Sequence, residues 1–124
     1  MGRDWKSRLR RVFASTGELE ADDEIVEAAL RGTDLVSECH AREQHSLSGV
    51  LRSVRYSARD ARPELVAELY DGSGSVDLVW LGRREVAGIE PGRRLLVTGR
   101  LSEGPQHLVM YNPSYTLLAP AVAS

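Results

Sequence analysis

The sequence predicts an all-β fold: a five-stranded barrel with a short helix between strands three and four, preceded by an N-terminal helical extension. Residues 46–118 contain five segments in which apolar and polar residues alternate, which is typical of half-buried strands. Residues 16–31 instead repeat apolar residues at spacings of three and four, which indicates a helix. At 124 residues the chain can bury one core without a metal or disulfide. We divide it into a helical extension (1–43), a barrel domain (44–118) and a tail (119–124).

The five strands are predicted at 46–56, 64–70, 75–81, 94–101 and 107–118, the last interrupted at Pro113. The second and third strands are joined by DGSG, in which Asp71 and Ser73 can bond backbone amides across the turn. Gly72 and Gly74 can adopt positive φ, as a twisted hairpin requires. A phosphate-binding loop is excluded because it needs a lysine after its last glycine, and no lysine follows Lys6.

A longer segment, GRREVAGIEPG at residues 82–92, joins the third and fourth strands. It has room for one or two helical turns, ended by Pro91 and Gly92. Five strands with a helix between the third and fourth is the element order of an OB-fold barrel. The sequence therefore predicts that fold.

The N-terminal extension changes sign of charge along its length. Residues 1–17 carry a net +4, residues 18–43 a net −7 and residues 44–124 a net +1. A helix is predicted from Ser15 or Thr16 to Gly32, with carboxylates in its first turns and an apolar stripe of Leu19, Ile25, Val26, Ala29 and Leu30.

The basic arm before that helix has its own apolar pattern. Its apolar residues follow the spacing i, i+4, i+7 and i+8, which predicts a short amphipathic helix: Trp5, Leu9, Val12 and Phe13. Such an arm suits nucleic acid or a partner groove, and equally suits docking onto its own domain. Contact of residues 3–13 with a membrane surface is the least favoured use.

No catalytic or metal-binding pattern stands out. The three histidines, His40, His45 and His107, are scattered, and Cys39-His40 lacks the second ligand pair of a zinc site. No nucleophile or metalloprotease motif occurs. We therefore predict a non-catalytic protein without cofactor or metal. The single cysteine and the lack of an apolar leader segment predict a cytoplasmic location.

Four stretches of the sequence also resemble a known family: SGVLRSVR, ELYDGSGSVDLVWLGRR, IEPGRRLLVTGRL and MYNPSY. They are similar to the OB-fold nucleic-acid-binding proteins of the tRNA-anticodon type, particularly a small stand-alone group in actinobacteria. A more distant similarity is to the wedge OB domain of RecG-type helicases. The resemblance covers about residues 47–118. It implies binding of single-stranded DNA or structured RNA without chemistry.

Two groups of arginines are candidate nucleic-acid contacts, since guanidinium groups can follow a phosphate backbone and an interleaved ring can stack a base. The first surrounds the end of strand one and consists of Arg52, Arg55, Tyr56, Arg59 and Arg62. The second brackets the predicted connecting helix and consists of Arg83, Arg84, Arg93 and Arg94. Trp80, Tyr111 and Tyr115 are expected in the barrel itself.

Strand parity predicts an acidic outer face on strands two and three. With Val76, Leu78 and Trp80 inside, the outward residues are Glu64, Val66, Glu68, Tyr70, Asp77, Val79 and Leu81. Three carboxylates oppose phosphate binding there. The alternative function is a protein–protein interaction module that uses this face, or the face receives the helix around Ile25 and Leu30.

Overall fold

The computed structural model describes residues 16–57 and 62–119. The predicted basic arm, Arg59 and the end of the tail lie outside the described residues. The elements are α2 (Thr16–Arg31), the 3-10 turn η1 (Val36–Glu38), β1 (Gln44–Tyr56), β2 (Glu64–Tyr70), β3 (Ser75–Leu81), β4 (Arg94–Ser102), β5 (Leu108–Tyr111) and β6 (Ser114–Leu117). All five predicted strands are present.

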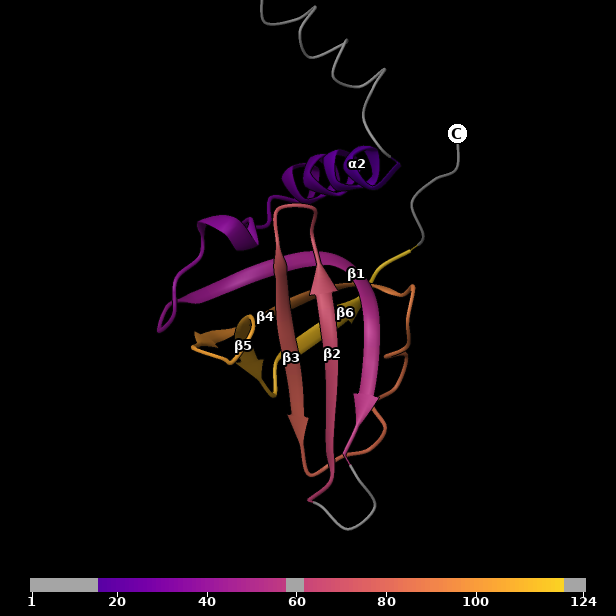
Figure 1. Cartoon of the computed structure of the whole chain (residues 1–124), viewed down its shortest axis with the longest axis vertical. Helices are drawn as coiled ribbons and strands as arrows, with labels where there is room; N and C mark the ends of the chain where they lie inside the picture. Colours follow the sequence, from indigo (N-terminus) through magenta and orange to yellow (C-terminus); the bar gives the residue numbers. More distant parts are fainter. Residues whose placement is uncertain (1–15, 58–61, 120–124) are drawn as a thin grey trace, which may run out of the picture.

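The strands form one six-stranded sheet that closes through β1 (Figure 1). Residues 44–50 of β1 pair with β4, and residues 50–56 pair with β2. The register shifts between Leu51 and Ser53, so β1 bulges at Arg52 where it passes from one partner to the other. The ring is completed by β3 and β5, which are parallel. This is an OB-fold-like arrangement, as the sequence predicts.

The last predicted strand is divided at Pro113, as expected. Asn112 has a positive φ of 46°, and its side-chain Oδ1 accepts a hydrogen bond from the Leu81 backbone N–H at 2.9 Å. β5 before this bend pairs with β3 and β4, whereas β6 after it pairs with β4 alone. The bend therefore lets the two halves of this predicted strand pair at different places in the barrel.

The prediction of a helix between β3 and β4 is wrong, because residues 82–93 form a loop of turns. Gly82, Gly88 and Gly92 have φ of 77°, 77° and 86°, a left-handed backbone that interrupts a right-handed helix. The loop instead contributes two buried side chains, Val86 and Ile89, to the core. It closes one end of the barrel without a helix.

The core contains the β3 side chains predicted to point inward, although Asp77 and Val79, predicted outward, are also only 7% and 5% exposed. Val76 and Leu78 are fully buried, and Trp80 is only 5% exposed with its ring edge-on to Tyr115 at 5.7 Å between centroids. Trp80 and Tyr115 thus belong to the barrel, as predicted. The largest fully buried side chains are leucines from four strands: Leu47, Leu51, Leu65, Leu69, Leu78, Leu95 and Leu101.

The DGSG turn is held by Asp71, which is 0% exposed. Its Oδ1 accepts hydrogen bonds from the backbone N–H of Ser73 at 2.9 Å and of Gly74 at 3.1 Å, and from the Ser73 hydroxyl at 2.7 Å. Its Oδ2 accepts a bond from the Val36 backbone N–H at 2.8 Å. The turn is therefore structural, as predicted, and it also fixes the segment before β1.

Helix α2 lies across the DGSG end of the barrel (Figure 1). A Cβ on Gly72 would lie 2.1 Å from the Ala21 carbonyl oxygen and 2.9 Å from Ile25 Cγ1, so only glycine permits this approach. The alternative in which the helix covers the outer face of strands two and three is wrong, since Leu30 is 78% exposed. The helix docks on the turn instead.

We expect Asp71→Ala to destabilise the fold by about 3 kcal/mol, because buried backbone donors lose a charged acceptor. Urea unfolding followed by circular dichroism measures this change. The control is Asp22→Ala, on the exposed side of α2, which should change the free energy of unfolding by no more than about 0.5 kcal/mol. Equal effects of the two substitutions would contradict the anchoring role of Asp71.

The contacts of the segment before β1 bear on the domain boundary predicted at residue 44. Val36 and Cys39 are core residues, and Asp34 bridges to Leu47. We expect a fragment of residues 44–118 to fold, but to be less stable than residues 33–119 by about 3 kcal/mol, since two buried side chains are lost. Thermal melts of both fragments test this, and equal melting temperatures would show that the segment contributes nothing.

Candidate functional site

One row of side chains crosses the outer face of four neighbouring strands. Strand register places Arg55 of β1 opposite Val66 of β2, Val66 opposite Val79 of β3, and Val79 beside Tyr111 of β5. Arg55 is exposed, and Tyr111 is 51% exposed because its neighbour Met110 takes the inward position. The row therefore has a cation at one end and an aromatic ring at the other.

A second cation, Arg52, lies on the same face, closer to the DGSG turn than Arg55. The guanidinium carbon of Arg52 is 3.4 Å from the centre of the Tyr70 ring. The β1 bulge directs this side chain across to β2, and stacking on the ring favours a flat guanidinium orientation. The Arg52 side chain is exposed, so its charge remains accessible to solvent.

Two of the three carboxylates predicted on this face, Glu68 and Asp77, accept hydrogen bonds from neighbouring side chains. Glu68 accepts a hydrogen bond from the Ser75 hydroxyl at 2.8 Å. The Asp77 carboxylate is 10% exposed and accepts a bond from Nδ1 of His107 at 3.1 Å. Val79, expected outward, is itself 5% exposed. Glu68 and Asp77 therefore have part of their hydrogen-bonding capacity filled before a ligand approaches.

The remaining predicted contacts gather at the lower end of the barrel. Tyr56 ends β1 and is 59% exposed. Arg62 precedes β2, and Arg83 and Arg84 follow β3, all with exposed side chains. A backbone hydrogen bond from Gly82 N–H to Pro63 C=O, at 2.9 Å, brings these two loops together.

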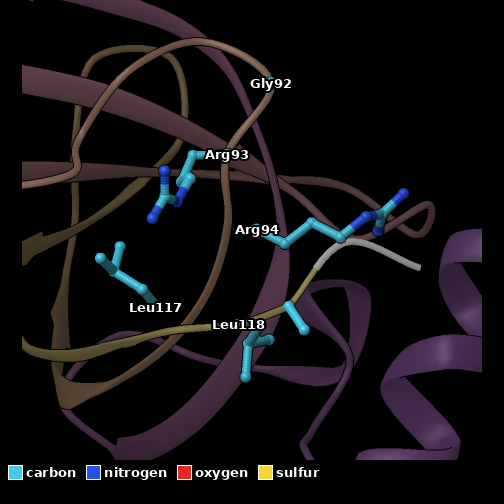
Figure 2. Close-up of a pocket in the computed structure, with 6 residues that line it drawn as sticks. Gly92, Arg93, Arg94, Leu117 and Leu118 are labelled. Atoms are coloured by element: carbon cyan, nitrogen blue, oxygen red, sulfur yellow. The ribbon is translucent and has the colours of Figure 1, made fainter. Parts of the chain in front are cut away.

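Arg93 and Arg94 do not join either group. They line a pocket of about 420 Å³ beside Leu117 and Leu118, where their side chains point in different directions (Figure 2). Arg93 approaches Glu90 at 3.6 Å. Both guanidinium nitrogens of Arg94 bind the carboxylate of Glu24 on α2, at 2.6 and 2.7 Å, and this pairing raises the pKa of Arg94. Arg94 therefore ties the helix to β4.

Tyr111 is the functional candidate that sequence reasoning assigned differently, since it was expected to complete the barrel. The signal was present in the alternation of β5, where Leu108 and Met110 contact the core and Tyr111 has the opposite parity. The sequence did not indicate which strand would pair with β5. Parallel pairing with β3 is what puts this ring beside Val79.

Another group of titratable side chains lies around the start of β1. His45 lies between Asp34 at 2.8 Å and Glu43 at 3.0 Å, and these hydrogen bonds raise its pKa. The same contact lowers the pKa of Glu43. Burial and nearby carboxylates raise the pKa of Cys39 to about 11, which leaves an unreactive thiol at neutral pH.

Residues 16–57 and 62–119 contain neither a metal-binding cluster nor a membrane-spanning helix. No group of three or more His, Cys, Asp or Glu side chains in these ranges is arranged to hold a metal ion. In the same part of the chain, no helix has the length and apolar character needed to span a membrane.

Comparison with known proteins relates the chain to a family. The family model described as OB-fold nucleic acid binding domain, of the tRNA-anticodon type, matches residues 45–118. No curated protein sequence matches. The solution structure of a replication factor A related protein from Methanobacterium thermoautotrophicum is similar at a TM-score of 0.51 and 13% identity, over 69% of this chain and 90% of that one.

A second similar structure is a replication protein A heterotrimer bound to single-stranded DNA, at a TM-score of 0.48 and 13% identity, over 78% of this chain and 76% of that one. At 13% identity, the likeness to the replication factor A related protein concerns the fold alone. The family match confirms the predicted OB-fold resemblance. The finer resemblances, to a stand-alone actinobacterial group and to the RecG wedge domain, stay predictions.

The His45 pairing predicts a pH dependence of stability. A histidine whose pKa is raised on folding stabilises the protein below its unfolded pKa, near 6.5, and this contribution is lost as the pH rises through the folded pKa. The free energy of unfolding should therefore fall between pH 6 and pH 8, and fall less in His45→Gln. The matched control is His40→Gln, whose side chain is 80% exposed. An unchanged pH profile in His45→Gln would contradict the assignment.

Proposed function

We propose that this chain, which belongs to the tRNA-anticodon family of OB-fold nucleic acid binding domains, binds single-stranded nucleic acid across the outer face of β1, β2, β3 and β5. The ligand is single-stranded DNA or an unpaired part of a structured RNA. The protein holds it without chemistry. OB-fold domains use this face of the barrel for oligonucleotides, which supports the assignment.

The observation that carries the proposal is the row from Arg55 to Tyr111, with the Arg52–Tyr70 stack above it. Both ends of the row are exposed, whereas the valines between them are partly or fully buried. The row offers a nucleic-acid strand one cation, Arg55, for its phosphate backbone and one ring, Tyr111, for a base. Single-strand binding depends on that combination of charge and stacking.

Each kind of side chain has a separate role in this proposal. Arg52 and Arg55 neutralise phosphates, and the planar guanidinium of Arg52 has a second face on which a base can stack. Tyr111 stacks a base. Glu68 and Asp77 repel the strand less than free carboxylates would, because Ser75 and His107 donate to them.

A protein partner on the same face is the second candidate. Leu81, at 51% exposed, lies opposite Glu64 at the lower end of the face and favours it. Such a partner would bury Leu81 and Tyr111 together. Salt dependence separates the two candidates, since only nucleic acid binding releases condensed counterions.

The proposal predicts a salt-dependent affinity for a fluorescein-labelled oligothymidylate. The slope of log affinity against log salt should be about −0.7 per phosphate neutralised, so replacing Arg52 and Arg55 together with Ala should make it shallower by about 1.4. Fluorescence anisotropy at several salt concentrations measures the slope. Arg100→Ala, an exposed arginine on β4, is the matched control and should leave the slope nearly unchanged.

Removing the exposed ring should act differently from removing charge. Tyr111→Ala should lower the affinity by about 1 to 3 kcal/mol while the salt slope stays nearly constant, because stacking releases no counterions. Tyr111→Phe should keep most of the affinity. Absence of binding to DNA and RNA oligonucleotides at low salt would overturn the proposed function.

A further inference from the structure

The loop that replaces the expected helix leaves a pocket at the lower end of the barrel. Its volume is about 480 Å³, and its lining comes from Tyr56, Leu65 and residues 85–90. Figure 1 places this end of the barrel opposite α2 and the DGSG turn. The pocket is separate from the outer face, since Leu65 is an inward residue of β2.

The lining of the pocket combines two nearly buried apolar side chains with an exposed tyrosine ring and exposed polar groups. The floor is formed by Val86 and Ile89, which are 7% and 5% exposed and belong to the core. Tyr56 rises beside it with 59% of its surface exposed, although the ring has the same strand parity as the core-packed Val54. An aromatic ring held at the edge of an apolar floor can stack one planar ligand.

Charge decides which part of a nucleotide fits. Glu85 and Glu90 line the pocket and are exposed, and Arg93, which approaches Glu90 at 3.6 Å, is not part of the lining, so the pocket itself offers a phosphate carboxylates and no cation. Carboxylates accept hydrogen bonds, and each standard base of a nucleotide keeps at least one N–H donor on its edge. A base therefore fits the pocket and its phosphate does not.

Arginines lie on the two loops that are joined at this end of the barrel. Arg62 and Arg83 flank the hydrogen bond between Pro63 and Gly82 that joins the two lower loops, and both side chains are exposed. Arg55 and Tyr56 are consecutive and point to opposite faces of β1. A nucleic-acid strand bound at Arg55 on the outer face therefore has to cross the lower rim of the barrel to reach Tyr56.

We propose that this pocket is a second base-binding subsite, which takes one unstacked base of the same strand against Tyr56 and leaves its phosphates to Arg62 and Arg83. The inference rests on the proposed function of the outer face. It assigns the loop 82–93 a role in binding, in addition to closing the barrel.

The length of the oligonucleotide tests the subsite. An oligomer of about 4 nucleotides can occupy the outer face alone, whereas one of about 12 can also reach the pocket. Tyr56→Ala should weaken binding of the longer oligomer about 5- to 100-fold and leave the shorter one nearly unchanged. Tyr56→Phe should bind both like the parent protein, since stacking needs only the ring.

A second variant tests the pocket without touching Tyr56. Ala87 lines it with an exposed side chain, so Ala87→Leu should fill it and reproduce the length-dependent loss. Circular dichroism establishes that each variant is folded. A loss that is equal for both oligomers, or no loss in either variant, would overturn the subsite while leaving the outer face intact. Failure of the parent protein to bind either oligomer would overturn both proposals.

Discussion

The buried carboxylate of Asp71 is the interaction on which the upper half of the structure depends. One oxygen closes the β2–β3 turn and the other holds the Val36 backbone amide, 35 residues earlier in the chain. A buried carboxylate is tolerated only where several donors satisfy it, and here four do. Because the turn is fixed, Gly72 can accept α2 in direct contact with the backbone.

That anchoring has a consequence for the candidate interface. With α2 held over the turn and tied to β4 by Glu24 and Arg94, the helix leaves the outer face of β2 and β3 open. Two carboxylates on that face, Glu68 and Asp77, accept hydrogen bonds from Ser75 of β3 and from His107, which precedes β5. The charge that a ligand meets depends on which groups remain unpaired after folding, so a count of acidic residues on a strand overstates the repulsion.

The lower half of the barrel is closed by apolar side chains of a loop rather than by a buried carboxylate. An OB-fold helix between the third and fourth strands would cover the barrel end with a regular element, and here Val86 and Ile89 do so from a loop. Three glycines with left-handed backbone shape the loop, and Leu117 packs against one of them, Gly88. The pocket beside Tyr56 is lined mainly by residues 85–90 of this loop.

Local pattern determined the strands, their inward and outward faces, the DGSG turn and the burial of Trp80, because alternation and turn chemistry act within a few residues. The missing helix shows the limit of that reasoning, since the room between β3 and β4 was sufficient but the glycines adopted left-handed turns. Tertiary structure alone decided which strand lies beside β5, and so the exposure of Tyr111 next to Val79. It also decided that Arg94 pairs with Glu24 while Arg52 stacks on Tyr70. These contacts join residues far apart in sequence, and no local preference encodes which distant side chain a charge will meet.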